Sequence, residues 1–215
     1  MKEIFEPILN SPLAKSYLAE LQQYLSSEDE RRKFFYKTNG EEKAEFINGE
    51  IVMHSAVRLV HSNILLSLAQ VIIEYVNHNK LGLVGYEKLM IRLTRNDYEP
   101  DLCFFPAEKA KLFTPDQKLF PAPEWIAEVL SESTEKNDRG IKMEDYAAHG
   151  VKEYWLVEPQ KQLVEQHYLK FGSFFLHKIY TEGQVLQSNV LNGLQLPVDA
   201  MFNEEANKQY RKQFF

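Results

Sequence analysis

The chain has few of the features that mark secreted, membrane or disulfide-stapled proteins. It has one cysteine, Cys103, so no disulfide can form within it. Its longest apolar runs look too short to cross a bilayer, and its start, Met-Lys-Glu-Ile-Phe-Glu-Pro, lacks the charged-then-apolar pattern of a secretory signal. We therefore expect a soluble protein of the reducing cytoplasm with no membrane partner.

The chain also lacks an excess of positive charge. Lys and Arg number 25 against 31 Asp and Glu, which gives a net charge of −6. Proteins that grip nucleic acid through bulk charge usually show a clear basic surface. The balance here excludes tight, salt-resistant binding by charge alone. It does not exclude a nuclease, because metal ions in a cleft can offset phosphate charge locally.

Internal repeats, low-complexity tracts and interdomain linkers are absent as well. At 215 residues, with 44% hydrophobic side chains, the chain is long enough for one substantial core. We expect a helical extension over residues 1–43, one main domain over 44–202 and a polar tail over 203–215.

Hydrophobic periodicity predicts the order of the elements. A helix is expected near 11–30, and Asn48-Gly49 between apolar flanks predicts a hairpin over 44–53. A one-sided apolar stripe predicts a helix over 57–78. The later elements are expected as strands at 83–93, 98–105 and 124–130, a helix at 138–149, a strand at 153–159, and an antiparallel meander at 162–168, 173–180 and 184–186. This order, helix, three strands, helix, strand, indicates an α/β protein with a mixed sheet.

Two acids lie in strand-like apolar runs. Asp101 follows Pro100 in Pro-Asp-Leu-Cys-Phe-Phe, and Glu128 lies in Trp-Ile-Ala-Glu-Val-Leu. Asp101 alone could be a turn or edge-strand residue, but Glu128 shares its face with Ile126 and Leu130. A buried charge needs a partner. Two converging carboxylates repel each other unless a hard cation binds them, so we expect a divalent metal between them.

Lys142 lies one turn into the predicted helix at 138–149, four residues before Tyr146. A lone helix lysine is usually a surface residue. Together with the two acids, however, it predicts a site that cuts phosphodiester bonds. Asp138, near the helix start, is interpreted as a capping acid that favours the helix dipole.

These pieces, in their order and spacing, resemble the Uma-type (Uma-two) restriction-endonuclease-like family, a branch of the PD-(D/E)XK nuclease superfamily. The similarity runs from about Glu45 to Phe202. It includes Glu45-Phe-Ile-Asn-Gly-Glu50-Ile-Val, His61, Pro100-Asp101, Glu128-Val-Leu-Ser, Asp138 with Lys142 and Tyr146, and Gly150-Val-Lys-Glu-Tyr-Trp155-Leu-Val-Glu-Pro159. The resemblance implies a restriction-endonuclease-like core of αβββαβ order.

The resemblance also implies roles for single residues. Superfamily members usually place the lysine two residues after the second acid, where this chain has Leu130; the Uma-type pattern moves it to the next helix, at Lys142. Metal ligands are then expected from Asp101, Glu128 and the Val129 carbonyl, with Mg²⁺ or Mn²⁺ as the ion. Two further residues have open alternatives: His61 is a core histidine or approaches the metal, and Glu50 is an exposed hairpin acid or a ligand.

The function implied is a metal-dependent endonuclease that hydrolyses DNA, with Asp101, Glu128 and Lys142 as catalytic residues. The alternative is a non-catalytic module that keeps the nuclease fold and binds nucleic acid or a protein. Metal-dependent hydrolysis of another substrate also stays open. A homodimer is a further possibility, since the meander after Pro159 offers a sheet edge for a symmetric contact.

Overall fold

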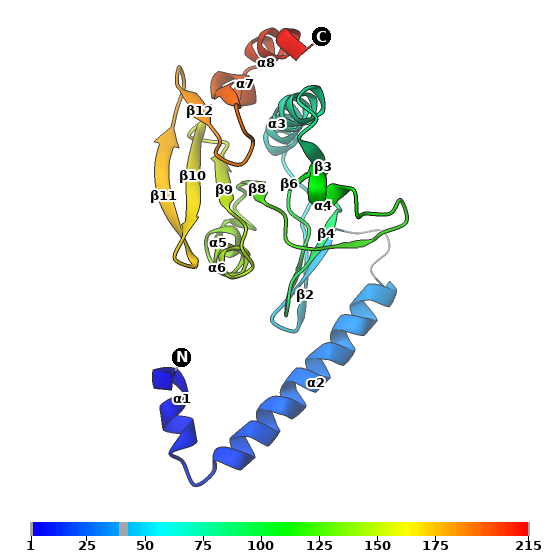
Figure 1. The fold of residues 1–215 in the computed structure, drawn as a ribbon, viewed down its shortest axis with the longest axis vertical. Helices are drawn as coiled ribbons and strands as arrows, with labels where there is room; N and C mark the ends of the chain where they lie inside the picture. Colours follow the sequence, from blue (N-terminus) through cyan, green and yellow to red (C-terminus); the bar gives the residue numbers. More distant parts are fainter. Residues whose placement is uncertain (1, 39–42, 215) are drawn as a thin grey trace.

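The computed structural model describes residues 2–38 and 43–214, which form a mixed α/β protein built on two mixed sheets (Figure 1). The main sheet has the strand order β11 (Ser173–Tyr180), β10 (Leu163–Lys170), β9 (Glu153–Glu158), β8 (Trp125–Val129), β6 (Leu102–Pro106) and β3 (Gly82–Tyr86). Its strands pair antiparallel except for β8 and β9, which are parallel.

The second sheet has the order β2 (Glu50–Met53), β1 (Ala44–Ile47), β5 (Asp97–Tyr98), β4 (Met90–Arg92) and β7 (Leu119–Phe120). The pair of β4 and β7 is parallel. A separate two-stranded ribbon joins β12 (Val185–Gln187) to β13 (Gln195–Pro197). The shortest helical segments are α4 (Ala107–Ala110), α7 (Asp199–Phe202) and the 3₁₀ turn at Lys212–Phe214.

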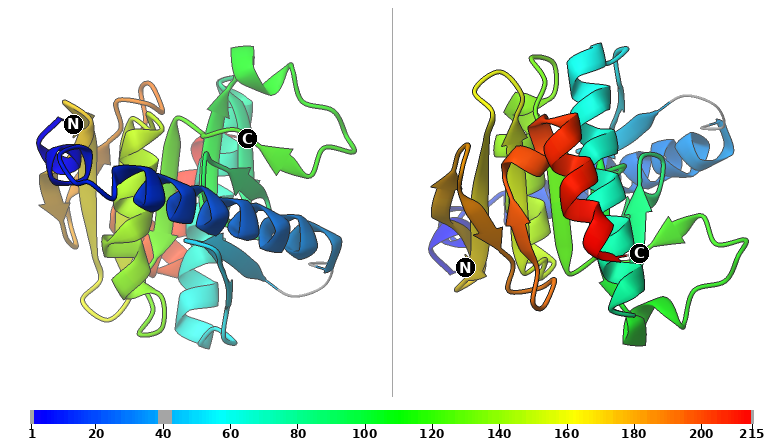
Figure 2. Two further views of the ribbon diagram at one scale, coloured as in Figure 1. Left: turned by 90° about the horizontal axis from the view of Figure 1, so that it is seen from below. Right: turned by 90° about the horizontal axis from the view of Figure 1, so that it is seen from above.

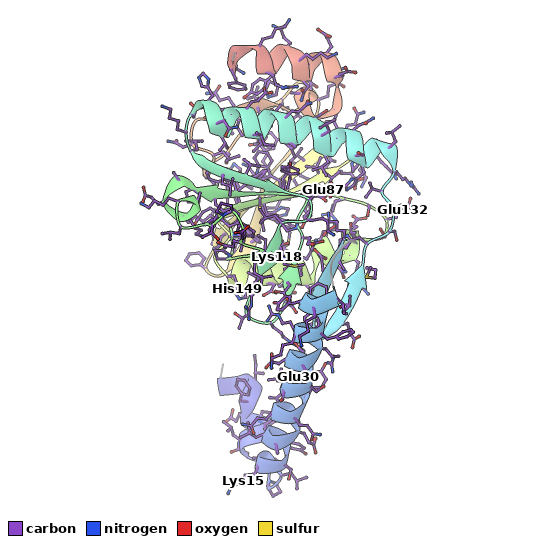
Figure 3. All side chains as sticks on the ribbon, turned by 90° about the vertical axis from the view of Figure 1, so that its right-hand side faces the viewer. Lys15, Glu30, Glu87, Lys118, Glu132 and His149 are labelled. Atoms are coloured by element: carbon purple, nitrogen blue, oxygen red, sulfur yellow. The ribbon has the colours of Figure 1, made fainter. Side chains whose placement is uncertain are left out.

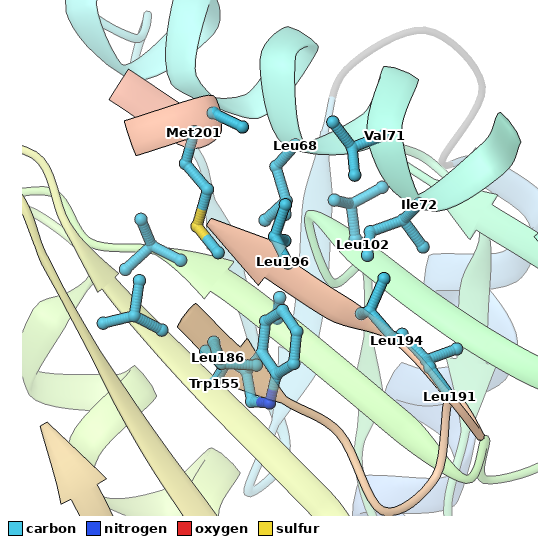
Figure 4. Packing of buried hydrophobic residues seen from close by; sticks show 14 of the residues in the cluster. Leu68, Val71, Ile72, Leu102, Trp155, Leu186, Leu191, Leu194, Leu196 and Met201 are labelled. Atoms are coloured by element: carbon cyan, nitrogen blue, oxygen red, sulfur yellow. The ribbon is translucent and has the colours of Figure 1, made fainter. Parts of the chain in front are cut away.

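One face of the main sheet packs against α3 (Leu59–His78), which confirms the predicted stripe. Leu68, Val71 and Ile72 of α3 are fully buried and face Leu102 of β6 and Trp155 of β9 in one core cluster (Figure 4). Within the described chain, α3 is the one helix long and apolar enough to span a membrane, contrary to the expectation from run length. Because one face of this helix is buried against the main sheet, we interpret it as a core helix.

The opposite face of the main sheet packs against α6 (Ile141–Ala148) and the second sheet. Side chains alternate along a strand, so Trp125, Ala127 and Val129 of β8 face α3. Ile126 and Leu130 belong to the other cluster. Glu128 shares their face, as predicted, and therefore lies between the two sheets.

The predicted hairpin at 44–53 is confirmed. β1 and β2 pair from Ala44 with Met53 to Ile47 with Glu50, and Asn48 and Gly49 form the turn with φ of 51° and 88°. Both residues have positive φ, as the tight hairpin turn requires. A Cβ at position 49 would meet only the end of the flexible Arg31 side chain and part of Glu28, so the positive φ is the main reason for glycine there.

Several predicted strands are shorter than expected because the chain changes sheets. The segment 83–93 divides into β3 and β4, since Glu87 has a φ of 56° that no strand permits. The segment 98–105 divides into β5 and β6 at Pro100. The helix at 138–149 is two helices, α5 (Glu135–Arg139) and α6, because Gly140 has the non-helical angles φ −111° and ψ −108°.

The two ends of the chain hold more structure than predicted. The first helix runs further than 11–30, as α2 (Ala14–Thr38), and α1 (Lys2–Leu9) precedes it; residues 39–42 of the predicted extension lie outside the described residues.

The expected meander ends at β11, because β12 pairs with β13 instead. The expected polar tail contains α8 (Glu204–Arg211), which lies beside α3 (Figure 2), while its final residue, 215, is not described. Asn207 donates to the Ser67 carbonyl, and Arg211 pairs with Glu74, so polar contacts hold α8 in place together with the packing of Tyr210 against the core.

Candidate functional site

The pairing of β6 with β8 brings Asp101 and Glu128 together. Leu102 opposes Ala127, so Asp101, one residue earlier, lies opposite Glu128. The Asp101 backbone N–H donates to Glu128 Oε2 at 3.1 Å, and the Val129 N–H donates to Asp101 Oδ2 at 2.9 Å. Both carboxylates are buried. Backbone hydrogen bonds thus fix the two acids relative to each other.

Lys142 enters the same region from α6 and is surrounded by carboxylates. Its Nζ lies 2.9 Å from Glu128 Oε1, 3.0 Å from Asp138 Oδ1 and 3.0 Å from Glu45 Oε1. The Tyr146 hydroxyl donates to Glu128 Oε1 at 3.3 Å. The lysine side chain is 3% exposed, so it is a buried ammonium rather than a surface one.

Asp101 has its own cationic neighbours. Lys43 Nζ donates to Asp101 Oδ1 at 2.9 Å, and His61 Nε2 lies 3.3 Å from Asp101 Oδ2. Burial opposes ionisation of Asp101, but the hydrogen bond from His61 and the charge of Lys43 hold its pKa well below the usual range. Burial likewise works against the charged form of His61, and Asp101 outweighs it, so the pKa of His61 is raised.

The acids of this cluster outnumber its permanent cations. Glu45, Asp101, Glu128 and Asp138 are four carboxylates, against the two ammonium groups of Lys43 and Lys142. Burial raises the pKa of Glu128 to about 8, against the opposing charge of Lys142. Burial also disfavours the Lys142 ammonium, but its three carboxylates raise the pKa of Lys142 far above the ordinary value. The crowding of four carboxyl groups around two ammonium groups thus favours the protonated form of Glu128 near neutral pH, and a divalent cation would favour its ionised form.

A cleft of about 880 Å³ opens onto this cluster. Asp101, Glu128, Lys142 and His61 line its inner part, while its outer part is lined by the start of α3 and by the loops after β8 and β9. Glu87 and Glu132, two acids that line the cleft, lie just below α3 in Figure 3. Arg58 pairs with Glu132 at 3.0 Å, with both side chains exposed, so solvent reaches this part of the cleft.

The structure brings together five of the six residues predicted for the site, namely Asp101, Glu128, Val129, Lys142 and His61. It does not bring Glu50 to them. The two-residue turn places Glu50 opposite Ile47 at the far end of the hairpin, where its side chain is exposed and does not line the cleft.

Three cluster residues were missed from the sequence as site residues. Glu45 lies in the apolar run Ala-Glu-Phe-Ile of β1 and faces the space between the sheets, the same signal that identified Glu128. Asp138 has the position of a capping acid in the sequence, yet it is buried and contacts Lys142. Lys43 follows residues of no clear pattern, and nothing in the sequence marks it as a partner of Asp101.

The donor atoms fit a hard divalent cation. Mg²⁺ takes one or two carboxylates together with water and phosphate oxygens, so Asp101, Glu128 and the Val129 carbonyl suffice. Over residues 2–38 and 43–214, no preformed group of three His, Cys, Asp or Glu side chains surrounds a single point. The crowding of the four carboxyl groups, and the Lys43 ammonium already bound to Asp101, are the observations that favour a cation here.

A comparison with known proteins identifies the family to which the chain belongs. Residues 21–199 match the family described as Uma2, putative restriction endonuclease. The chain belongs to that family, which confirms the resemblance read from its motifs.

The structure is also similar to a crystal structure from Anabaena variabilis ATCC 29413, described as a putative nuclease belonging to DUF820. The two share 20% sequence identity with a TM-score of 0.68, over 80% of this chain and 96% of that chain. At that identity the likeness establishes the fold. A search of curated proteins gave no match.

Proposed function

We propose that the protein is a metal-dependent endonuclease that hydrolyses phosphodiester bonds in DNA. The observation that carries this proposal is the buried cluster of Asp101, Glu128 and Lys142 at the inner end of the cleft. Membership of a family described as a putative restriction endonuclease supports it. So does the order α3, β3, β6, β8, α5 with α6, β9 around the main sheet, which is the αβββαβ order of a restriction-endonuclease-like core.

In this proposal Asp101, Glu128 and the Val129 carbonyl hold Mg²⁺ or Mn²⁺. When bound, such an ion polarises a phosphoryl oxygen and lowers the pKa of water. The hydrogen bonds between Asp101 and β8 hold the two carboxylates in place before the ion arrives. These bonds fix the positions of the two acids, and an ion would still have to displace the Lys43 ammonium from Asp101.

Lys142 supplies a fixed positive charge. Its raised pKa keeps it protonated at any working pH, so it acts as a hydrogen-bond donor and not as a general base. An ammonium beside the scissile phosphate stabilises the negative charge that grows there in the transition state. Glu45 and Asp138 hold the ammonium in position through contacts of 3.0 Å each.

One observation favours a second candidate, a non-catalytic module that binds nucleic acid or a protein. Lys142 already contacts three carboxylates, and Lys43 contacts Asp101, so each cation has a structural partner. Such a module would retain the cluster for stability alone. The enzyme is preferred because a buried ionic cluster is seldom more stabilising than apolar residues of similar volume, and here it opens onto a cleft.

Incubation with labelled single-stranded, duplex and branched DNA, and with RNA, tests the proposal. The parent protein with Mg²⁺ or Mn²⁺ is expected to cleave at least one DNA, and excess EDTA is expected to abolish cleavage. Glu128→Gln, checked by circular dichroism to be folded, is expected to lose cleavage and to bind the metal ion more weakly than the parent. DNA binding without cleavage of any substrate would instead support the binding module.

A further inference from the structure

The rest of the described chain covers only the second half of one face of α2. Residues on this face recur at alternating steps of three and four, the spacing of a helix-pairing stripe. They are Leu18, Leu21, Leu25, Glu28, Arg32 and Phe35. The last three are buried against the second sheet and its loops. The first three are 55%, 50% and 40% exposed, so no described residue covers them.

The covered half fixes the direction of the helix. Arg32 makes two hydrogen bonds to the Asp97 carboxylate, at 2.6 and 2.7 Å, and Arg95 makes two to Glu28, at 2.8 and 2.9 Å. The uncovered half consequently projects away from the sheets (Figure 1), and Lys15 lies near its outer end (Figure 3).

The helix α1 folds back beside this projection and adds to the uncovered apolar surface. Its Ile4, Phe5, Ile8 and Leu9 are all exposed, as are Tyr17 and Tyr24 on α2. Isolated exposed apolar residues are ordinary, but a contiguous set of this size on two adjoining helices marks an interaction surface.

Charge distinguishes the two halves of α2. From residue 14 to 27 the charged side chains are Lys15 and Glu20 alone. From 28 to 38 there are seven, Glu28, Asp29, Glu30, Arg31, Arg32, Lys33 and Lys37. In a symmetric pair, identical surfaces meet, so a patch rich in one sign of charge would repel its copy. The uncovered half is nearly free of that repulsion.

We propose that two copies of this chain pair through α1 and the first half of α2 to form a symmetric dimer. The exposed apolar side chains of the two helices would form the centre of this interface, which polar residues of the same helices would surround. The surface carries no charge pattern that would select a different partner. This interface is separate from the edge at β11, which the sequence had suggested.

Sedimentation velocity of the full chain from about 1 to 100 μM tests the dimer. The parent is expected to sediment at twice its monomer mass of 25.2 kDa. The double variant Leu21→Glu, Leu25→Glu is expected to sediment as a monomer with an unchanged circular dichroism spectrum. Leu112→Glu, which changes an equally apolar residue that is 72% exposed after α4 and outside the proposed surface, is expected to remain dimeric.

Disulfide trapping provides a test that does not depend on disrupting the surface. The natural cysteine, Cys103, is fully buried, so Leu18→Cys, Leu21→Cys or Leu25→Cys each adds the accessible thiol. Mild oxidation is expected to give a covalent dimer from at least one of these variants and none from Leu112→Cys. A parent that is monomeric throughout, with or without binding to lipid vesicles, would overturn the proposal. A dimer that persists in the double variant would overturn it as well, and would point to the β11 edge.

Discussion

Lys43 is the residue whose placement bears most directly on metal binding. Its ammonium lies 2.9 Å from Asp101 Oδ1, where a cation would be expected to bind. Burial disfavours the charge on Lys43, yet Asp101 and Glu128 raise its pKa, so it stays protonated. The lysine and a divalent ion therefore compete for the same carboxylate.

Replacing this lysine should strengthen metal binding. Lys43→Met is expected to tighten Mn²⁺ binding on the order of tenfold, since a hydrogen bond to a charged group contributes about 1.5–3 kcal/mol. Isothermal titration calorimetry measures the change. Lys111→Met, which alters an exposed lysine paired with Glu108, is the control and should leave the affinity unchanged. Weaker Mn²⁺ binding by Lys43→Met would show that the lysine assists the ion instead of competing with it.

Lys142 should be important for folding as well as for any chemistry. Removing it leaves three buried carboxylates without their shared cation, and such a loss typically costs about 3–5 kcal/mol. Lys142→Met is expected to lower the free energy of unfolding by that order, measured by urea denaturation without metal. A second change, Glu45→Gln, removes one unpaired charge and should recover part of the loss. Additive losses in the double variant would contradict the shared cluster.

The acids and the lysine of this cluster were largely visible in the sequence. Glu128 was identifiable because a charge in an apolar strand violates the pattern around it. Glu45 shows the same violation, whereas Glu50 is suggested only by its match to the family pattern, and sequence gives no means of telling which end of a hairpin faces the core. Lys43 could not be predicted, because its contact with Asp101 joins residues 58 positions apart.

At the scale of elements, Glu153 at the start of β9 joins the main sheet to the loop before β13. Its Oε1 accepts from Trp155 at 2.6 Å and Gln166 at 2.7 Å, and its Oε2 accepts from Ser188 at 2.9 Å. The Asn189 and Val190 backbone N–H groups also donate to Oε2, at 3.0 and 3.1 Å. These hydrogen bonds attach the segment after β12 to the main sheet, a connection that the pairing of β12 in the predicted meander would otherwise have made.

The raised pKa of Glu153 predicts a pH dependence of stability. Burial raises this pKa above the value of 4.5 that applies in the unfolded chain, although its hydrogen bonds oppose the shift. Above pH 4.5 the folded state therefore holds the proton more often than the unfolded state, and stability falls as pH rises through the folded pKa. Between pH 5 and 7 the free energy of unfolding should fall more steeply for the parent than for Glu153→Gln. Denaturation curves whose midpoints shift in parallel would contradict this.

Elements with strong local signals were predicted well. The Asn48-Gly49 turn and the stripe of α3 depend on neighbouring residues alone. Element ends were missed where long-range contacts decide them. The break at Glu87 has no glycine, proline or asparagine to announce it, and its N–H bonds to the Asp101 carbonyl at 3.1 Å, in a distant part of the sequence. The position of α8 involves polar contacts with α3, which no hydrophobic pattern reveals, as well as the packing of Tyr210.

At the scale of the whole molecule, the position of the acidic cluster makes the net negative charge of the protein compatible with its proposed function. The net charge of −6 gives no general attraction to nucleic acid. Buried acids are concentrated instead in the cluster at the inner end of the cleft, where a bound divalent ion would add positive charge. DNA binding is therefore expected to depend on the metal as well as on salt concentration.

Single-turnover cleavage of duplex DNA with Mg²⁺ tests the central claim most directly. Asp101→Asn removes a charge that the proposed ion needs, while Asp116→Asn alters an exposed acid in the loop before β7 as a matched control. Loss of one well-placed electrostatic group costs about a hundredfold to a thousandfold in rate. Asp101→Asn should thus be slower than the parent by at least that factor, and Asp116→Asn should equal the parent. Equal rates for the parent and Asp101→Asn would contradict a metal-dependent nuclease centred on this cluster.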